Sequence, residues 1–396
     1  MKEMDTTKNT NKIVEYPKIV FYSSYGHIPH LSSDLMLLQD FNNEDDEALH
    51  LHVDIGDMIQ KSFGDLPFNN VIKRHSNNRL IYSPRHMKAR ESFVTSQGVS
   101  IDGPGGRRRI SNVDYAKRIF IDKPYVAISM ADHIKIPDLK KNALNSNDIK
   151  KARLAIERTN KWFDELKHFE SIDWSDTKLF GVALAIPIIQ KISNDEKICK
   201  YDITDPVKHL INNAVDGIVV GGSFFEDSLD NLVHMIKEVK KTVVENNTSD
   251  KYIAVMVQGA RTLYDIAACV NAGADILSTS YPSDLSTKGQ VMSVSSILAS
   301  KKRKLDDVTT LKVSTVIDLN DSSFCEDILP LTPGCGCHCC SNHSRAYVHH
   351  LLKAKEMLAE SLLQSHNHYQ MLLLFKWIRD NKNEQNSYDR LLELFA

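Results

Sequence analysis

Short apolar segments rich in β-branched residues alternate along the chain with longer amphipathic segments. The short segments are expected to be strands, over residues 18–23, 125–129, 179–184, 217–220, 252–257 and 275–280. The longer segments show the spacing of amphipathic helices, over residues 148–169, 206–214, 227–244 and 262–272. Strands that alternate with helices form parallel sheets, and continuous apolar runs are typical of strands covered on both faces. The sequence therefore predicts an α/β fold.

The length of the chain favours a closed barrel over an open sheet. With 396 residues, the chain has room for the roughly 250 residues of a TIM-type (β/α)8 barrel and for a further subdomain. The strand pattern also allows an open doubly wound sheet, which we keep as the alternative. We expect the barrel to span residues 13–330, after a disordered tail over residues 1–12.

Charge and hydropathy exclude several classes of protein. Lysine and arginine (49 residues) nearly balance aspartate and glutamate (51 residues), for a net charge of −2. The chain is therefore not a strongly basic stand-alone nucleic-acid-binding protein, although local basic patches stay open. Because no apolar run reaches about 18 residues, we expect no membrane span. The polar first twelve residues lack the apolar core of a signal peptide.

Two local patterns invite functional interpretations that their surroundings do not support. Residues 102–109 are Asp-Gly-Pro-Gly-Gly-Arg-Arg-Arg, without the Gly-Lys-Ser/Thr ending of a phosphate-binding loop. Pro-Gly-Gly between apolar residues is typical of a hairpin turn. Residues 301–304, Lys-Lys-Arg-Lys, open a charged segment over 301–326 that we expect to be a connecting loop. We interpret them as a solvated basic turn.

Four of the seven cysteines crowd into residues 335–340. This spacing suits a metal site in a reducing compartment better than a disulfide framework. Zinc takes four tetrahedral ligands, and three thiolates with one imidazole make a closed structural site. We predict one structural Zn²⁺ bound by Cys335, Cys337 and Cys340, with Cys339 turned away as a spectator. The surrounding residues 331–396 are expected to form a zinc-binding helical subdomain packed on the barrel.

Spacing alone leaves the fourth ligand open, although His366 is favoured. The candidates near the cluster are His338, His343, His349, His350, His366 and His368. A continuous helix from Cys340 to His366 would be roughly 39 Å long at about 1.5 Å per residue, too long to close the site. If His366 is the ligand, the chain has to turn back between Lys353 and Leu358.

The C-terminal motifs resemble the zinc region of tRNA-guanine transglycosylases. Cys-x-Cys-x-x-Cys is followed by Arg-Ala-Tyr-x-His-His-Leu at a helix start and by a distant His-Asn pair at 366–367. Segments 179–182, 216–222 and 273–277 sit where that family has barrel strands. The resemblance implies a (β/α)8 barrel and the ligands Cys335, Cys337, Cys340 and His366. Family members exchange an anticodon guanine for queuine or a related base, through an aspartate that attacks the ribose and holds the tRNA covalently.

The family's catalytic pattern is altered in this chain. Active members have Asp-x-x-Asp-x-x-x-Pro-Thr-Arg, with the second aspartate as nucleophile, where residues 275–284 place Ser278 and end in Asp284. A serine without an activating base is a poor nucleophile, and no histidine is near Ser278 in the sequence. A carboxylate at position 284 would repel an anticodon phosphate.

Further positions of the family's base-binding site are also altered. No Asp-Ser-Gly-Gly-Phe-Gln stretch with a general acid occurs, and residues 88–97, which we assign to that region, contain no aspartate. The base-reading glutamine is replaced by Leu184. Asp132 keeps a base-recognition position, and Gly221-Gly222 offers backbone hydrogen bonds.

Together these losses imply a non-catalytic member of the family, which is not an enzyme by itself. By the resemblance, its partners are the catalytic queuine tRNA-ribosyltransferase subunit in a heterodimer and tRNAs with a GUN anticodon. A homodimer in the absence of that partner stays open. The implied location is the cytoplasm, with peripheral association with the cytoplasmic side of the mitochondrial outer membrane.

Two other functions stay as alternatives. One is an active transglycosylase with a displaced nucleophile, Asp275 or Asp284, although we favour a local role for Asp275, binding backbone amides at a strand end. The other is an unrelated zinc-barrel hydrolase. That class needs metal ligands at strand ends with one position open for water. His27 and His30 are better interpreted as turn residues.

Overall fold

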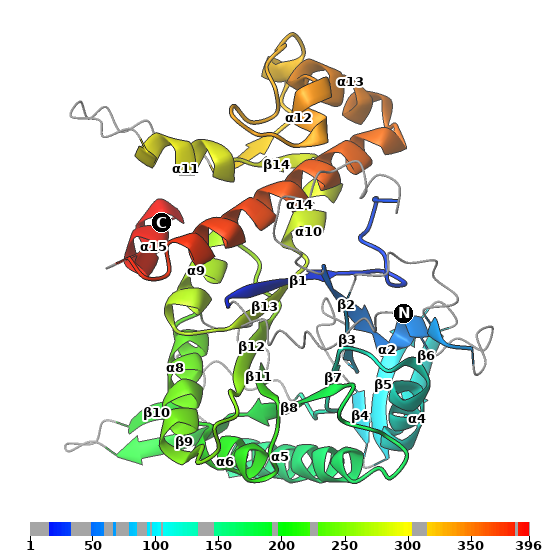
Figure 1. The fold of residues 1–396 in the computed structure, drawn as a ribbon, viewed down its shortest axis with the longest axis vertical. Helices are drawn as coiled ribbons and strands as arrows, with labels where there is room; N and C mark the ends of the chain where they lie inside the picture. Colours follow the sequence, from blue (N-terminus) through cyan, green and yellow to red (C-terminus); the bar gives the residue numbers. More distant parts are fainter. Residues whose placement is uncertain are drawn as a thin grey trace, which may run out of the picture.

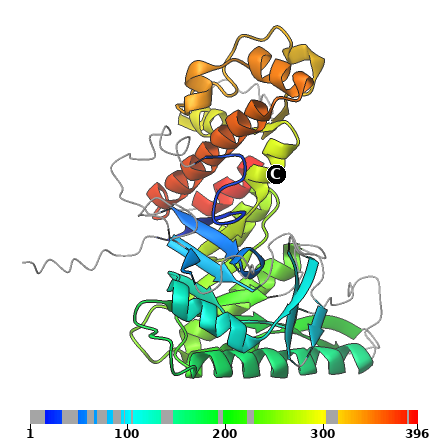
Figure 2. The same ribbon diagram turned by 90° about the vertical axis from the view of Figure 1, so that its right-hand side faces the viewer.

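Figures 1 and 2 show the computed structural model of the 396-residue chain. The structure describes residues 16–32, 49–58, 66–68, 79–84, 93–95, 97–103, 106–133, 146–191, 197–221, 229–302, 315–384 and 387–395. The predicted N-terminal tail lies outside these residues. Within them, no helix has the length and apolar character needed to cross a membrane.

Eight strands close into a parallel barrel, in the order β1-β13-β12-β11-β8-β7-β3-β2. Every described pairing around it is parallel. The strands are β1 (Lys18–Tyr22), β2 (His50–Asp54), β3 (Arg79–Ser83), β7 (Val126–Ile128), β8 (Lys178–Leu184), β11 (Gly217–Gly221), β12 (Ala254–Gln258) and β13 (Ile276–Thr279). The predicted TIM-type barrel is confirmed, and the open sheet is excluded.

Strands β2 and β3 escaped the sequence prediction. In β2, Leu51 and Val53 pack in the large apolar cluster between the strands and the surrounding helices. The alternate positions, His50, His52 and Asp54, are buried as well but face the inside of the barrel. Polar residues at these inward positions interrupt the continuous apolar run by which the other barrel strands were recognised.

The barrel interior holds a separate apolar cluster. Its members alternate along the strands with those of the outer cluster, as side chains on opposite faces of a strand do. They include Val20, Ile81, Val126, Ile128, Phe180, Val182, Leu184, Val219, Met256 and Ile276. The barrel is therefore a packed core and not an open pore.

The helices between the strands largely follow the predicted ranges. The four predicted helices are present as α5 (Ser146–Lys167), α6 (Thr204–Asn212), α8 (Leu229–Asn246) and α9 (Leu263–Asn271). Helix α4 (Asn112–Asp122) was not predicted. It begins with a capping box in which Ser111 and Asp114 bind each other's backbone N–H groups. A short helix, α2 (Ile55–Met58), follows β2 directly.

Two antiparallel additions decorate the barrel. Strands β4 (Phe93–Thr95), β5 (Gly98–Gly103) and β6 (Gly106–Ile110) form one sheet, with Gly103 opposite Gly106. The hairpin predicted over residues 102–109 is confirmed, although residues 104–105 at its tip lie outside the described residues. Strands β9 (Ile186–Lys191) and β10 (Lys197–Asp202) form a second hairpin.

The C-terminal part forms a subdomain at the top of Figure 1. It contains α10 (Tyr281–Thr287), β14 (Gln290–Met292), α11 (Val294–Lys302), β15 (Val316–Asp318), the 3-10 helix η1 (Ser322–Phe324), α12 (His338–Asn342), α13 (Arg345–Ala354) and α14 (Met357–Asp380). Its apolar core includes Val291 and Leu319, which precede the expected boundary at residue 331. Strand β15 lies in the segment expected to be a loop, whose residues 303–314 are outside the description.

Helix α14 joins this subdomain to the barrel. Its first half contributes Ala359, Leu362 and Leu363 to the subdomain core. Its second half contributes Leu374 and Ile378, among others, to the barrel's outer core. Helix α15 (Ser387–Phe395) then packs on α9. The views in Figures 1 and 2 both show α14 crossing from the subdomain to the barrel.

Candidate functional site

Three cysteines and one histidine converge between α12 and α14. The Sγ atoms of Cys335, Cys337 and Cys340 lie 3.7, 3.4 and 3.3 Å from Nδ1 of His366. All four donor atoms lie within 4.8 Å of one another. Cys337 and His366 are buried, and the other two are partly exposed. A Cys₃His set of this size is able to hold a tetrahedral metal ion.

The local sequence explains how the three thiols come together. Gly334 adopts a φ of 74°, a left-handed conformation that glycine takes without strain. Cys337 is the N-cap of α12, and its Sγ accepts a hydrogen bond from the backbone N–H of Cys340 at 3.3 Å. A side chain at Gly336 would lie 3.1 Å from the Tyr369 hydroxyl. Gly334 therefore supplies the left-handed turn of the loop, and Gly336 leaves room for the Tyr369 hydroxyl.

The predicted reversal of the chain before His366 is confirmed. Helix α13 ends at Ala354. Its C-cap, Lys355, has a left-handed φ of 57° and ψ of 38°, and its N–H donates to the carbonyls of Leu351 and Leu352. Helix α14 begins two residues later and runs back toward the cysteines. His366 thereby reaches the cluster, with no exposed surface.

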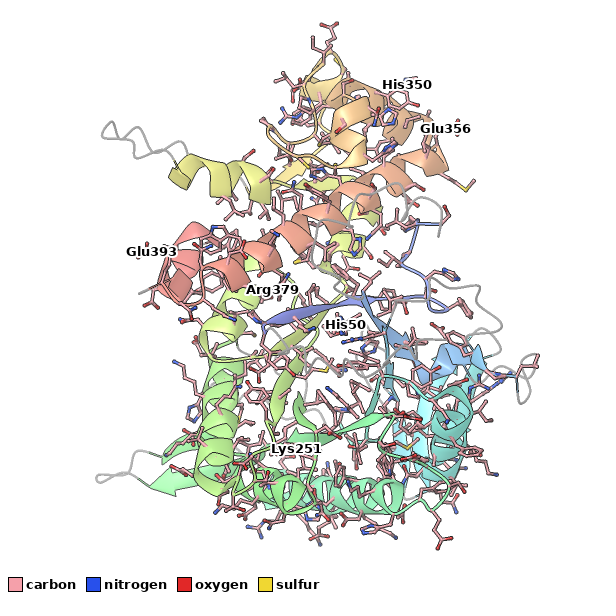
Figure 3. All side chains as sticks on the ribbon, viewed as in Figure 1. His50, Lys251, His350, Glu356, Arg379 and Glu393 are labelled. Atoms are coloured by element: carbon pink, nitrogen blue, oxygen red, sulfur yellow. The ribbon has the colours of Figure 1, made fainter. Side chains whose placement is uncertain are left out.

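The other candidate histidines lie elsewhere. Nδ1 of His349 is 2.7 Å from the Leu319 carbonyl. His368 packs edge-on against Phe21, with ring centroids 4.0 Å apart, and burial lowers its pKa to about 3. His343 stacks on Tyr347, and the exposed His350 is labelled near the top of Figure 3. Cys339 is buried in the apolar core of the subdomain, outside the donor set.

The second nitrogen of His366 orients the ring. Nε2 lies 2.9 Å from the carbonyl oxygen of Met292 in β14. A carbonyl only accepts hydrogen bonds, so Nε2 carries a proton, and Nδ1 is the nitrogen that faces the sulfurs and would bind a metal ion. The backbone of β14 therefore selects the tautomer that binds metal.

Asn367, the second residue of the His-Asn pair, holds the same strand. Its Oδ1 accepts from the Met292 N–H at 2.9 Å. Its Nδ2 donates to the Gln290 carbonyl at 2.9 Å and to the Ser286 hydroxyl at 3.0 Å. Three residues further along α14, Gln370 accepts from the Ser295 N–H at 2.7 Å. The sequence motif identified the pair, but only the structure shows what Asn367 binds.

The electrostatics of the cluster favour a cation. Hydrogen bonds with Cys337 and Cys340 lower the pKa of Cys335, and hydrogen bonds with Cys335 and Cys340 raise the pKa of Cys337. Burial alone would lower the pKa of His366, but the neighbouring Cys335 and Cys340 raise it to about 10. Negative charge thus accumulates at this point. A bound Zn²⁺ would neutralise it, so the residues present fit a structural zinc ion.

The barrel mouth, where the carboxyl ends of the parallel strands meet, is where barrel enzymes place their catalytic groups. Ser278 of β13 lies at this end, and its Oγ is 3.3 Å from Nδ1 of His52 in β2. No sequence pattern predicted this neighbour, which is 226 residues away. Both side chains have no exposed surface. A ribose therefore cannot reach Ser278 in this structure.

The side chains at two further positions of the mouth, Leu184 and Asp132, contact other residues of the same chain. Leu184, at the end of β8, belongs to the apolar cluster inside the barrel. Asp132 forms an ion pair with Arg158 of α5, and its backbone N–H donates to the Thr159 hydroxyl at 3.0 Å. Burial raises the pKa of Asp132, and Arg158 opposes that effect. The carboxylate is thus already engaged. Gly222 and residues 88–92, also singled out in the sequence, lie outside the described residues.

Comparison with known proteins places this architecture in a family. The family model described as queuine tRNA-ribosyltransferase matches residues 3–395. The chain belongs to this family. The resemblance inferred from the zinc motifs is therefore confirmed.

Several family relatives cover most of the chain. Queuine tRNA-ribosyltransferase accessory subunit 2 of Danio rerio is 24% identical over 405 residues, which span 94% of this chain and 90% of the relative. The protein of the same name from Trichoplax adhaerens is 24% identical, over 97% of this chain and 93% of the relative. The queuine tRNA-ribosyltransferase of Lachnospira eligens is 28% identical, over 81% of this chain and 75% of the relative.

Sequence reasoning missed a group of carboxylates at the mouth of this family barrel. Asp54 ends β2 and is 2% exposed. Burial raises its pKa to about 7, opposed by a hydrogen bond from the Gly56 N–H and assisted by the charge of Asp57. Burial also raises the pKa of Tyr22 to about 12, and so do the charges of Asp57, Asp54 and Asp284. The alternation of polar and apolar residues in β2, His-Leu-His-Val-Asp, was the sequence feature that could have indicated Asp54.

The two aspartates considered as displaced nucleophiles lie at opposite ends of β13. Asp275 precedes the strand. It accepts from the Val255 N–H at 2.7 Å and the Tyr252 hydroxyl at 2.6 Å, and pairs with Lys240 at 2.5 Å. The predicted local role of Asp275 is confirmed. Asp284, in the first turn of α10, lies at the mouth and accepts from the Ser280 hydroxyl at 2.7 Å.

Proposed function

We propose that this chain is the non-catalytic subunit of a heterodimeric queuine tRNA-ribosyltransferase. In this role it supports the exchange of guanine for queuine at the wobble position of tRNAs with a GUN anticodon. The observation that carries the proposal is Ser278, which occupies the nucleophile position of the family. It is fully buried and hydrogen-bonded to His52. Without an accessible carboxylate there, the family's nucleophile position offers no group to attack the ribose.

The electrostatics of the mouth support the same assignment. The position that meets an anticodon phosphate in active relatives carries Asp284, and Asp57 lies close enough to affect the same tyrosine, Tyr22. Negative charge at this point repels the phosphates that RNA-binding sites attract. The names of the relatives from Danio rerio and Trichoplax adhaerens, accessory subunit 2, fit a chain of this kind.

The zinc subdomain supports a partner-binding role. We propose one structural Zn²⁺ per subunit, held by Cys335, Cys337, Cys340 and His366. Bound zinc would fix the loop before α12 against α14. The subdomain exposes large apolar side chains, Ile328 and Met357 at 85% each and Leu329 at 53%. Exposed apolar side chains of this size are a feature of protein–protein contact surfaces. The partner we propose is the catalytic subunit, and a homodimer would use the same subdomain when that subunit is absent.

A second candidate function is favoured by Asp284. This carboxylate is partly exposed at the mouth and lies six residues after the family's nucleophile position. An active transglycosylase would use it, in place of Ser278, to attack the ribose. Its hydrogen bond to Ser280 within the first turn of α10 assigns it a local role instead.

Base exchange separates the two functions. Incorporation of labelled guanine into a GUN-anticodon tRNA would be measured with the purified chain, with the catalytic subunit, and with both. We expect strong activity only in the mixture, with no covalent tRNA adduct on this chain and no change on Ser278→Ala. Exchange by the chain alone, lost on Asp284→Asn, would contradict the proposal and establish the second candidate.

For location, we propose the cytoplasm, with peripheral attachment to the outer face of mitochondria through the partner or the tRNA. Fractionation of cells that express a tagged chain tests this. Recovery with mitochondria that is lost on trypsin treatment of intact organelles would support attachment to the outer face. Protection from trypsin would contradict it.

A further inference from the structure

The opposite end of the barrel, where the strands begin, contains a cavity. Its volume is about 680 Å³, in the range of small-molecule sites. Its floor is the apolar interior of the barrel, formed by Ile81, Val126, Phe180 and Ile276. Its rim comes from the segments that lead into the strands. This end is remote from the mouth that carries Ser278, so the proposed function leaves the cavity unexplained.

Basic side chains occupy the first inward positions of several strands. Lys18, His50 and Lys178 line the cavity. Each stands two residues before an inward residue of the same strand, such as Val20 or Phe180. Arg79 is paired with His50 in the register of β2 and β3 and begins its strand in the same way. Inward positions of such barrels usually carry apolar, branched side chains. A ring of basic groups at these positions is therefore unusual and indicates a specific role.

The rim adds further cations from outside the barrel strands. Lys251 comes from the segment before β12 and Lys382 from the turn after α14. Arg379, at the end of α14, donates to the Pro17 carbonyl at 3.4 Å and holds this turn beside β1. His50, Lys251 and Arg379 are labelled in Figure 3, on separate elements of the barrel and α14.

Nearby carboxylates are committed to other partners. Asp216 is the acidic residue of the lining. It pairs with Lys251 at 2.8 Å and accepts from the Leu179 N–H at 2.8 Å. Asp275 is bound by Lys240, Tyr252 and the Val255 N–H. Among the lining residues that the structure describes, four lysines and one carboxylate leave an excess of three positive charges. Concentrating cations in a concave site of low polarity favours a bound anion.

Aromatic rings stand among these cations. The Arg79 guanidinium lies 4.4 Å from the Tyr125 ring centroid. Lys178 lies 5.1 Å from the same centroid and donates to the Tyr125 hydroxyl at 3.2 Å. Tyr16 and Tyr252 stack with centroids 5.4 Å apart. Burial and the charge of Asp275 raise the pKa of Tyr16 to about 12, so this ring adds no negative charge at neutral pH.

We propose that this cavity binds a nucleoside monophosphate or a closely similar phosphorylated aromatic molecule. The phosphate would lie between Lys18, Lys178 and Lys382, which supply ammonium donors to its oxygens. The planar base would lie against the tyrosines, because aromatic side chains stack on any base. The packed barrel interior closes the floor of this cavity, so it accommodates a single nucleotide rather than a strand that passes through.

Calorimetric titration of the full chain with guanosine 5′-monophosphate tests the proposal. We expect saturable binding that weakens at high salt, because exposed charges are screened. Guanosine and inorganic phosphate, each with half of the recognised groups, should bind at least about tenfold more weakly. Lys178→Gln should weaken binding about tenfold, and Lys382→Gln by a smaller factor. Lys382 is exposed, so its variant is expected to fold even if the change at Lys178 disturbs the barrel.

Lys208→Gln is the matched control, since this exposed lysine of α6 is absent from the lining. The affinity of this variant for guanosine monophosphate should equal that of the unaltered chain. The proposal is overturned if guanosine monophosphate does not saturate, or if Lys178→Gln and Lys382→Gln both bind it normally. Binding of a single-stranded oligonucleotide without binding of the mononucleotide would reassign the site to RNA contact. Equal affinity for inorganic phosphate would overturn the role of the tyrosines.

Discussion

The zinc subdomain keeps the family pattern, whereas the mouth of the barrel, at the carboxyl ends of the strands, departs from it. In the subdomain, every residue that the pattern requires is present, and Cys335, Cys337, Cys340 and His366 converge. At the mouth, the nucleophile position carries Ser278, buried against His52. The barrel architecture has been kept, while the residue at the family's nucleophile position has been replaced. A barrel of this family is therefore able to form without the nucleophilic aspartate.

The difference has a physical origin. The loop before α12 has little apolar surface of its own, and metal ligands are what would hold it together. Losing one ligand would cost the whole site. The barrel, by contrast, is held by two large apolar clusters. Replacing a carboxylate at its mouth by a smaller buried group removes a desolvation cost and leaves the packing in place.

The largest expected effect follows from Cys337→Ala. Removing this ligand should abolish zinc binding and unfold the region from α12 to the first half of α14, because structural zinc contributes on the order of 10 kcal/mol to small sites. Pairing with the catalytic subunit should be lost as well. Metal content by mass spectrometry, limited proteolysis and co-purification measure the three effects.

Cys339→Ala is the matched control, because Cys339 lies in the apolar core and outside the donor set. It should retain one zinc and cost only about 1 kcal/mol for the small cavity. A Cys337→Ala chain that stays folded and still pairs would show that the subdomain does not need its metal.

The next effect is that of Asn367→Ala. The change leaves the buried Met292 N–H and Gln290 carbonyl without this partner, and we expect a loss of about 2–4 kcal/mol. Urea unfolding of the metal-loaded chain measures it. Asn342→Ala, at an exposed amide of α12, should cost less than about 1 kcal/mol. Equal losses would mean that β14 is held by packing and not by Asn367.

A smaller, pH-dependent effect is expected for Asp54→Asn. The folded pKa of about 7 lies above the unfolded value of about 3.9, so the folded state binds the proton more tightly. Stability is therefore full below about pH 4 and decreases as the pH rises toward 7. The amide removes this loss, with a gain on the order of 2 kcal/mol at pH 8 relative to pH 5.

Thermal unfolding at both pH values measures this gain. Asp176→Asn, at an exposed carboxylate paired with Lys123, serves as the control and should show little difference between the two. A constant effect of Asp54→Asn across pH would indicate that Asp54 is ionised throughout and better hydrated than its burial indicates.

The smallest effect is expected for Ser278→Ala. The hydroxyl lies 3.3 Å from a nitrogen of His52, and losing this contact should cost within about 1 kcal/mol. Base exchange by the heterodimer should be unchanged. A large fall in base exchange, with stability unaltered, would mean that Ser278 takes part in the reaction. The barrel mouth would then be functional, as the zinc subdomain is, and the two regions would no longer differ.

Local sequence determined much of this protein. Continuous apolar runs identified β8, β11, β12 and β13 because both faces of these strands are covered. The spacing of the cysteines and their glycines indicated the metal ligands because the loop is closed by neighbours in the chain. The reversal before α14 was predictable because His366 could not otherwise reach the cysteines.

Tertiary structure decided the features that depend on barrel closure. Strands β2 and β3 were not recognised, because His50, His52 and Arg79 face an interior that local pattern could not reveal. The neighbour of Ser278 comes from 226 residues away. The basic cavity at the other end gathers its residues from strand starts and from the turn after α14. The sequence encodes which side chains of a strand share a face, but only the closure of the sheet into a barrel decides which side chains of different strands come into contact.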